Sequence, residues 1–520
     1  MSKSRTKNVV LISLTGGASR ITDLLFNFIL RTIFIYSLGE VYLGLNSVFS
    51  TILQVLSLSE LGVGSAIIFY MYKPIAEQNI EKVKSFMHFY KKAYQIIGLI
   101  IFCIGISLLP VLKYIVNLES EAPINLYWVY LIYLLNSVVS YLFGSYMRSM
   151  LVAMQKQYVD NIINMSMSIV STVVCAAILI ATKNYYFYLC VRIGSSIATN
   201  FVVRYLVLKE HPYLRDKNVT KLDAREKKQI FKDVKSIFIF RFSATLSNSL
   251  NTIIISTMLG TVIAGYSSNY DLIFTSVTGI ISIVINSVSA SVGNLNATSD
   301  TKTKVKVFRE LDLINYFIVT VAFCGLACLS NDFINVWLRN PSYVIPQETV
   351  IIKAIHMLLV QTLNVFFVFR ESMGLFSYGR YRMFVSGIVS LGLSIFMVKY
   401  IGLSGVYLAS ALSVALITFF EFPKILFKHG FQISPVKEYF RAILKILLSC
   451  SICALCYIIV NVLLPLEGSI TLAVFACKVF LVLVISLCCL IVCFCKTSAW
   501  RDLENRLSSF VRRSKTRESK

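Results

Sequence analysis

Seven of the ionisable side chains within long apolar stretches of this chain are candidates for chemistry, because a charged group is costly there. They are Arg20, Asp23, Arg31, Glu60, Arg192, Arg241 and Asp271. A charge in hydrocarbon costs at least about 2.5–3.5 kcal/mol, so such residues usually mark a polar cavity or a transport path. Arginine forks suit phosphate, because two parallel N–H donors match two oxygens. The arginines are therefore candidate ligands of an anionic, phosphate-bearing substrate.

Each of these residues also has a purely structural interpretation. Arg20 and Asp23 are three positions apart, so on a helix they share a face and can neutralise each other. Arg241 can extend its side chain to the membrane surface. Glu60 can hydrogen-bond to a neighbouring helix. If it faces a cavity instead, burial favours its protonated form, and it becomes a candidate coupling residue, as does Asp271.

The composition indicates what kind of element positions these residues. Of 520 residues, 57% are hydrophobic and 15% are charged, against about 45–50% and about 25% in soluble domains. The excess predicts an all-α membrane protein with about fourteen transmembrane helices of the length that a bilayer requires. The expected spans are 9–38, 41–72, 93–117, 124–147, 160–182, 186–208, 237–262, 263–296, 311–336, 350–372, 383–400, 405–426, 441–464 and 470–495.

The net charge of +24 reflects membrane topology rather than a nucleic-acid partner. Most Lys and Arg residues lie in the N-terminal segment and in the loops that follow even-numbered spans. The positive-inside rule places these residues, and both termini, in the cytoplasm. The residues expected on the opposite side are Lys113, Lys183, Arg339, Lys353 and Lys399. The expected partner is the lipid bilayer, and a nucleic acid is excluded.

An internal repeat predicts two lobes. Sliding residues 20–47 by 221 positions pairs Arg20, Asn27, Gly39 and Gly44 with Arg241, Asn248, Gly260 and Gly265. Six spans separate the copies, so both copies have one orientation, and a substrate site is expected between the lobes near mid-membrane. The predicted parts are an N-terminal lobe (1–208), a cytoplasmic linker (209–236), a C-terminal lobe (237–426), two further helices (427–495) and a basic cytoplasmic tail (496–520).

The remaining motifs argue against catalysis. The sequence has no G-x-x-x-x-G-K-[ST] loop and no H-E-x-x-H motif, so we expect a transporter with no catalytic residues, no metal and no cofactor. The 13 cysteines are interpreted as small apolar fillers of the spans. The segment Ile80–Tyr94 has a basic side and an apolar side, which predicts an amphipathic helix at the cytoplasmic membrane surface.

Taken together, the spans, the six-plus-six repeat, the basic N-terminus and the charged first span resemble the polysaccharide transporter family. This family belongs to the multidrug/oligosaccharidyl-lipid/polysaccharide exporter superfamily. The run from Glu60 to Gly98 is similar to the second-span signature of Wzx-like repeat-unit flippases. The resemblance implies a MATE-like fold and a cationic cavity, for which Arg20, Arg31 and Arg241 are the matching residues. Arg192 is a candidate on the sequence alone.

The resemblance also implies a function. The expected substrate is an oligosaccharide repeat unit on undecaprenyl pyrophosphate, which alternating access exports across the bacterial cytoplasmic membrane for capsule, exopolysaccharide or O-antigen synthesis. Coupling to H⁺, to Na⁺ or to the membrane potential stays open. A polysaccharide polymerase and chain-length machinery are the implied protein partners.

Three alternatives remain. A cation-coupled multidrug antiporter predicts an acidic cavity, whereas the charges within the spans are mainly cationic. A membrane-embedded polysaccharide-assembly enzyme predicts an acidic active-site loop. A scaffold that transports nothing predicts that every cavity substitution is tolerated.

Overall fold

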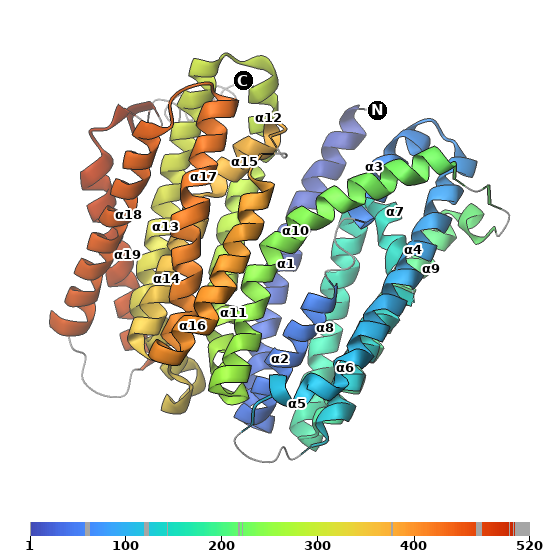
Figure 1. The fold of residues 1–520 in the computed structure, drawn as a ribbon, viewed down its shortest axis with the longest axis horizontal. Helices are drawn as coiled ribbons and strands as arrows, with labels where there is room; N and C mark the ends of the chain where they lie inside the picture. Colours follow the sequence, from blue (N-terminus) through green and yellow to red (C-terminus); the bar gives the residue numbers. More distant parts are fainter. Residues whose placement is uncertain are drawn as a thin grey trace, which may run out of the picture. The chain divides into compact units, whose positions relative to one another are not determined.

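The computed structural model describes residues 2–57, 63–118, 124–142, 144–216, 219–220, 222–375, 378–463, 471–498, 500–502 and 504. Every regular element in this part of the chain is a helix, which confirms the predicted all-α fold (Figure 1). The chain divides into two compact units, residues 1–268 and 269–520. The boundary lies inside one helix, whereas the repeat placed it at the 209–236 linker. The lobe boundaries drawn from the repeat stay a prediction.

The described helices account for the predicted spans. Ten of them are long and apolar enough to cross a membrane, and the bent pair Leu126–Leu142 and Ser145–Ala153 makes an eleventh. Two shorter apolar helices, Glu40–Leu56 and Leu250–Leu259, match further predicted spans. The segment Tyr381–Gly430 is long enough for two spans, since it contains 50 residues. The protein is therefore a multi-pass membrane protein.

In the N-terminal unit, α1 packs along α8, α8 along α9, α4 along α6 and α2 along α10. Short 3-10 turns, among them η3 (Ser145–Met147) and η4 (Pro212–Arg215), link some of the helices. The α-helices of this unit are α1 (Ser2–Leu38), α2 (Glu40–Leu56), α3 (Val63–Ala76), α4 (Ile80–Ser107), α5 (Leu112–Ile115), α6 (Leu126–Leu142), α7 (Arg148–Ala153), α8 (Gln157–Thr182), α9 (Tyr185–Glu210), α10 (Ala224–Leu259) and the start of α11 (Thr261–Ser287).

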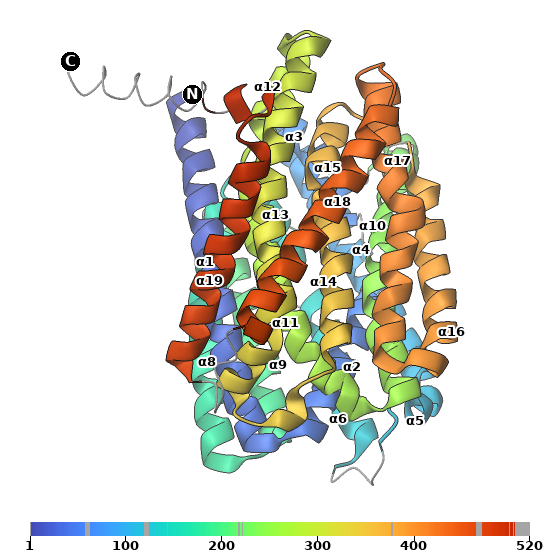
Figure 2. The same ribbon diagram turned by 90° about the vertical axis from the view of Figure 1, so that its left-hand side faces the viewer.

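In the C-terminal unit, α13 is the central helix and packs against α14, α18 and α19 (Figure 2). Phe308 and four other phenylalanine rings form a cluster that packs the early part of α13 against α15 and the segment that follows α17. After α11, the α-helices of this unit are α12 (Ser289–Thr298), α13 (Thr301–Leu338), α14 (Gln347–Thr362), α15 (Asn364–Ser372), α16 (Arg380–Ser413), α17 (Phe419–Lys424), α18 (Val436–Tyr457) and α19 (Leu472–Phe494).

Glycines with positive φ make the sharp breaks between several helices. Gly39, with φ of 87°, separates α1 from α2, and Gly260, with φ of 105°, separates α10 from α11. L side chains rarely adopt this backbone conformation, so glycine is favoured at both breaks. These two glycines are the pair that the repeat aligned. Gly402, with φ of 56°, lies at the kink inside α16, between the predicted spans 383–400 and 405–426.

The segment Ile80–Tyr94 differs from the prediction. It is the first half of the continuous helix α4, which runs from Ile80 to Ser107 after an Asn79 cap that accepts a hydrogen bond from the Lys82 amide. The side chains on its apolar side, Val83, Phe86 and Tyr90, are buried within the protein. This side of the helix therefore does not lie flat in lipid. The amphipathic pattern was interpreted correctly as a helix with one apolar face, but the face packs on protein.

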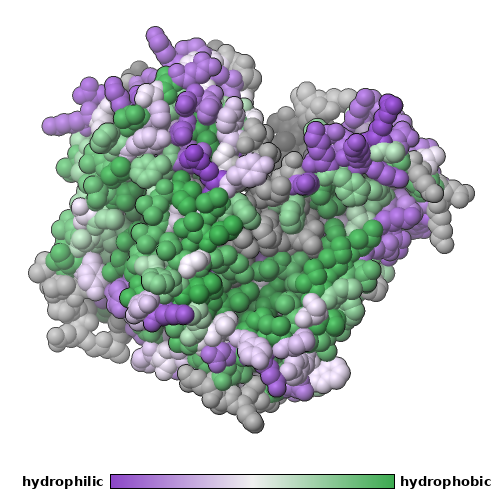
Figure 3. Space-filling view, viewed as in Figure 1, coloured by the Kyte–Doolittle hydropathy of each residue, from purple (hydrophilic) through white to green (hydrophobic). Residues whose placement is uncertain are grey.

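The surface of each unit carries an apolar band. Large apolar side chains such as Phe187 and Phe201 on α9, and Phe440 and Leu444 on α18, are exposed. The face shown in Figure 3 has green apolar residues in the middle of each unit and purple hydrophilic residues gathered at one end. Such a band would be costly in water, and it is the surface that a lipid bilayer covers.

Candidate functional site

Two of the predicted arginines lie within electrostatic range of one tyrosine in the N-terminal unit. Arg31 on α1 and Arg192 on α9 both act electrostatically on Tyr188, one turn before Arg192. Arg31 also donates a hydrogen bond to the Ser268 hydroxyl. Arg192 is exposed, although Tyr133, Tyr185 and Cys175 also lie within its electrostatic range. Arg192 is therefore an exposed cation within electrostatic range of side chains from α6, α8 and α9.

The aromatic side chains around these arginines form an ordered group. Phe34 packs edge-on against Tyr185 and Tyr188, with ring centroids 5.8 and 5.2 Å away. Tyr185 and Tyr188 are nearly parallel, at an interplanar angle of 11°. The Tyr133 and Tyr185 hydroxyls lie 3.0 Å apart, and Tyr133 also donates to the Asn46 side chain. This group of rings joins α1, α2, α6 and α9, and it fixes the orientation of the helices that carry the arginines.

Polar stripes on three helices continue from this group. On α2, Asn46, Ser50, Gln54 and Ser57 recur every three or four residues, so they share one face. The stripe on α6 consists of Tyr133, Asn136, Ser137 and Ser140, and the stripe on α9 consists of Tyr188, Arg192, Ser196 and Asn200. The sequence analysis missed these stripes, although polar residues at helical spacing in apolar helices are a readable signal.

Residues of the three stripes line an open cavity of about 340 Å³. Its lining includes Ser50, Gln54 and Ser57 from α2, Asn136, Ser137 and Ser140 from α6, and Ser196 from α9. The buried Asn136 Oδ1 has no hydrogen-bond partner among the described residues. An unmatched polar atom in a cavity is satisfied by water or by a polar ligand. Hydroxyls and amides of this kind bind the hydroxyls of a sugar.

A hydrogen-bonded network closes the far end of these stripes. Arg148 of α7 binds Asp160 at 2.9 Å and Asn164 at 2.8 Å, both on α8, and also reaches the buried Asn200 of α9. Asn200 in turn contacts Ser140 of α6. The network ties α6, α7, α8 and α9 together, so the stripes sit on a braced framework.

The other predicted residues of the first and seventh spans have different outcomes. Arg20 is exposed and Asp23 is half-buried on α1, and the described structure contains no ion pair between them. Arg241 lies in α10, but its side chain is outside the described part. Glu60 also lies outside the described residues. The structure therefore brings together Arg31 and Arg192 and leaves the roles of Arg20, Asp23, Glu60 and Arg241 as predictions.

Asp271 has a partner that the sequence analysis placed elsewhere. Lys353, which we expected beyond the membrane, is a buried residue of α14, and its Nζ lies 2.6 Å from Asp271 Oδ1 on α11. The Tyr407 hydroxyl of α16 accepts a second hydrogen bond from Lys353 at 2.9 Å. The side of the membrane on which Lys353 lies stays a prediction. Its partner Asp271 was missed because charge counting along the sequence does not show which residues meet in the fold.

The C-terminal unit pairs two further charges. Lys478 of α19 lies 2.8 Å from Asp332 of α13, and Lys445 of α18 forms an ion pair with Asp312 near the start of α13. All four side chains are largely buried. The described acids of α11 and α13 at these positions are thus each neutralised by a lysine. Arg192, by contrast, forms no ion pair within the described part of the chain.

Cysteines of the C-terminal unit meet across two helices. Cys324 and Cys328 of α13 interact with Cys453 of α18, and Cys324 also interacts with Cys456. All four are free thiols. No group of three or more His, Cys, Asp or Glu residues in the described chain is arranged to hold a metal ion. These thiols occupy the interface as small apolar groups do.

Comparison with known proteins identifies the architecture. One solved structure, "Lipid II flippase MurJ, inward closed conformation", matches with a TM-score of 0.67 over 93% of this chain and 99% of that chain, at 11% sequence identity. An inward-facing multidrug resistance MATE family transporter of the MOP superfamily matches with a TM-score of 0.59, covering 79% and 96% of the two chains at 13% identity.

A third solved structure, a MOP superfamily transporter from Pyrococcus furiosus, matches with a TM-score of 0.55 at 13% identity, covering 80% of this chain and 94% of that chain. Its description states that reverse polarity of the binding pocket suggests a different function. No family model matches this sequence, and no curated protein does. The chain therefore has the fold that these MurJ and MATE transporters share.

Proposed function

We propose that this protein is a flippase that exports an oligosaccharide linked to undecaprenyl pyrophosphate across the cytoplasmic membrane of a bacterium. The observation that carries the proposal is the pair Arg31 and Arg192, both within electrostatic range of Tyr188, which stacks with Tyr185. Arg192 lies one turn before Ser196, a residue that lines the polar cavity. The similarity in fold to a lipid II flippase supports it. So does the resemblance of the Glu60–Gly98 run to Wzx-like flippases.

The chemistry of this site fits the two parts of such a substrate. Guanidinium groups bind pyrophosphate oxygens through paired hydrogen bonds. The tyrosine rings offer apolar faces to sugar rings, and the serine and asparagine side chains bind sugar hydroxyls. The prenyl tail stays in the lipid throughout. Arg20 and Arg241 are proposed to extend the cationic lining, and Asp23 is proposed to be a polar residue of the same cavity.

Alternating access moves the charged head group outward. Moving about two negative charges against an inside-negative potential of about 100 mV gains roughly 4–5 kcal/mol, at about 2.3 kcal/mol per charge. The membrane potential therefore favours export. Coupling to H⁺ or Na⁺ through Glu60 or through the Asp271–Lys353 pair is a further proposal. A polysaccharide polymerase and chain-length machinery are the proposed consumers of the exported unit.

The multidrug antiporter is the second candidate, since MATE transporters share the fold. A cavity for cationic drugs needs acidic groups that are available to them. In the described chain, Asp271, Asp312 and Asp332 are each bound to a lysine. Among the predicted cavity residues whose side chains are described, Arg20 and Arg192 are exposed cations, and the one acid without an ion pair there, Asp23, is half-buried. These observations favour an anionic substrate.

The proposal is tested by mass spectrometry of lipid-linked oligosaccharides in cells depleted of this protein. Accumulation of complete repeat units with loss of surface polysaccharide is the expected result. Truncated units would indicate an assembly enzyme instead. Unchanged lipid-linked sugars together with ion-driven dye efflux would indicate the antiporter. If depletion abolishes surface polysaccharide but every cavity variant restores export, the protein is a scaffold.

A further inference from the structure

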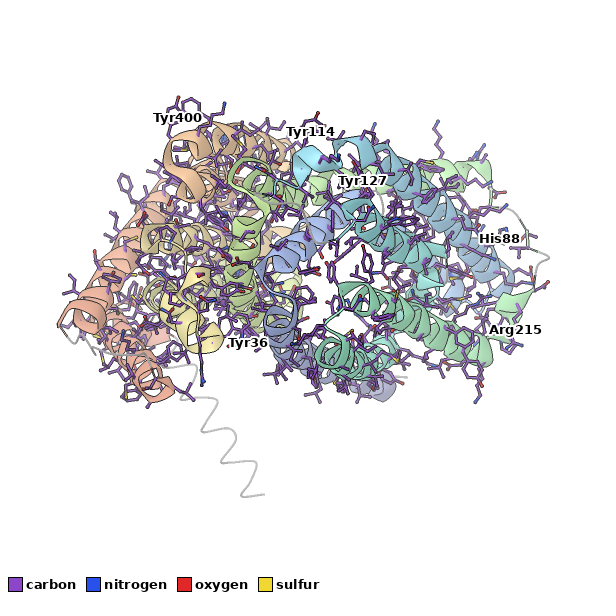
Figure 4. All side chains as sticks on the ribbon, turned by 90° about the horizontal axis from the view of Figure 1, so that it is seen from below. Tyr36, His88, Tyr114, Tyr127, Arg215 and Tyr400 are labelled. Atoms are coloured by element: carbon purple, nitrogen blue, oxygen red, sulfur yellow. The ribbon has the colours of Figure 1, made fainter. Side chains whose placement is uncertain are left out.

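A second cavity in the N-terminal unit lies away from the polar stripes. It has a volume of about 440 Å³ and is formed by the first turns of α4, by η3, by the last turns of α9 and by the segment after α9. Its basic lining residues are Lys84, His88, Lys91, Arg204 and Arg215. Figure 4 shows His88 and Arg215 at one edge of this unit. None of these residues belongs to the proposed transport site.

Specific contacts hold the segment after α9 against α4, so one wall of this cavity is fixed in place. The Lys84 Nζ lies 2.9 Å from Asp216 Oδ2, and the Ser85 hydroxyl donates to the Thr220 carbonyl at 2.7 Å. Lys84 and Ser85 are both buried. A further ion pair joins Lys82 to Glu226 at 2.6 Å. The predicted linker is therefore docked along the helix that contributes the cations.

The cavity has an excess of positive charge. Among the described residues, the ion pairs of this cavity are those of Lys84 with Glu81 and with Asp216. Asp216 is the one carboxylate in the lining, and Lys84 neutralises it. Lys91, Arg204 and Arg215 are exposed and form no ion pair among the described residues. Three cations facing one hollow repel one another, and a bound anion removes that repulsion. An anion is the ligand that this lining selects.

The rest of the lining specifies what kind of anion. Met87, Met147, Leu208, Leu214 and Val219 supply an apolar floor and walls. The Tyr146 ring is buried there, and its hydroxyl has no hydrogen-bond partner among the described residues, which leaves it available to a phosphate oxygen. A free phosphate has no use for the apolar part. A phosphate carried by a lipid fills both parts, because the first methylenes of its acyl chains are apolar.

We propose that this cavity binds the phosphate head group of an anionic phospholipid. The positive-inside rule places the start of α4 and the end of α9 at the cytoplasmic surface, where anionic lipid is available. Basic pockets between transmembrane helices on this side are a known type of site for anionic head groups. Arg204 and Arg215 donate hydrogen bonds to the phosphate oxygens, and Lys91 adds a positive charge. The bound lipid bridges α4, α9 and the linker.

The test uses purified full-length protein and native mass spectrometry. The protein is first equilibrated with detergent micelles that contain phosphatidylglycerol and phosphatidylcholine. The pocket variant is Lys91→Gln/Arg204→Gln/Arg215→Gln. The matched control is Lys92→Gln/Lys209→Gln/Arg225→Gln, which removes equal charge from exposed residues outside the cavity lining. At about 1 kcal/mol per cation near a surface, retained phosphatidylglycerol should fall at least about ten-fold in the pocket variant and little in the control.

Each other outcome would overturn the proposal. Equal losses in both variants mean that general surface charge holds the lipid. No loss in either means that the cavity holds none. Displacement of phosphatidylglycerol by millimolar inorganic phosphate means that the site takes free phosphate rather than a lipid. Because the assay measures binding without transport, its result is independent of whether the protein is a flippase.

Discussion

Gly44 of α2 and Gly265 of α11 touch each other. A methyl group on Gly265 would lie 2.8 Å from the Gly44 nitrogen, and one on Gly44 would lie 2.2 Å from the Thr261 carbonyl oxygen. The internal repeat aligns these two glycines with each other. The two glycines that the repeat pairs are therefore residues whose missing side chains let α2 and the start of α11 approach closely.

The first prediction concerns this close approach. Gly44→Ala forces α2 away from the Thr261 backbone, and overpacking of this kind costs about 1–3 kcal/mol. We expect a lower melting temperature in detergent and loss of transport. The matched control is Gly17→Ala in α1, where a Cβ would meet nothing within 4 Å, so its stability should be unchanged or slightly higher. Equal melting temperatures for wild type and Gly44→Ala would contradict the close approach.

The second prediction concerns Arg192. Arg192→Gln removes a cation that has no ion pair in the described chain, so the fold should survive while phosphate binding weakens. Loss of one charge-assisted contact, at about 1.5–3 kcal/mol, should reduce surface polysaccharide in complemented cells at least about ten-fold. Arg192→Lys should restore part of it, since the charge returns without the fork. Full export by Arg192→Gln would remove this residue from the site. Arg225→Gln, in the exposed start of α10, is the control.

The third prediction uses the asymmetry of the Asp271–Lys353 pair. Lys353 is buried, whereas about half of the Asp271 side chain is exposed. Asp271→Asn strands a buried ammonium and should cost up to about 3 kcal/mol, whereas Lys353→Met leaves a carboxylate that water can reach. We expect the melting temperature of Asp271→Asn to fall further than that of Lys353→Met, and the double variant to recover much of the loss. A lower melting temperature for Lys353→Met than for Asp271→Asn would contradict this prediction.

A fourth prediction concerns pH and the end of α9. Burial, and secondarily the charge of Lys156, lower the pKa of His211 below its usual value. The unfolded chain therefore binds more protons between the lowered pKa and about 6.5, and stability falls as pH drops through that window. Between pH 7.5 and pH 5.5, the melting temperature of wild type should fall further than that of His211→Gln. Identical slopes would indicate that His211 is protonated equally in both states.

Much of the fold could be predicted because membrane helices leave strong local signals. Apolar length located the spans, and the repeat pairing of Gly39 with Gly260 located two equivalent helix breaks. The kink at Gly402 likewise falls between two predicted spans. These features depend on residues near one another in the chain, so composition and periodicity suffice to find them.

The site was only partly predictable because its partners are distant in sequence. Arg31 and Arg192 were each named, but their meeting at Tyr188 requires α1 and α9 to be placed. The Asp271–Lys353 pair was missed for the same reason. The stripe from Asn46 to Ser57 is different, because the helical spacing of its uncharged polar residues is present in the sequence itself.

The central claim, that Arg31 and Arg192 serve the transfer of a lipid-linked oligosaccharide, is tested most directly in proteoliposomes. Lipid-linked oligosaccharide extracted from depleted cells is reconstituted with purified wild-type protein or with Arg192→Gln, and a membrane-impermeant sugar-modifying reagent reports the exposed leaflet. Wild type should make nearly all of the substrate reactive, while Arg192→Gln leaves the inner-leaflet half protected, as in protein-free liposomes. Transfer by Arg192→Gln as complete as that by wild type would contradict the claim. Equal protection with wild-type protein and with no protein, in the presence of a membrane potential, would also contradict it.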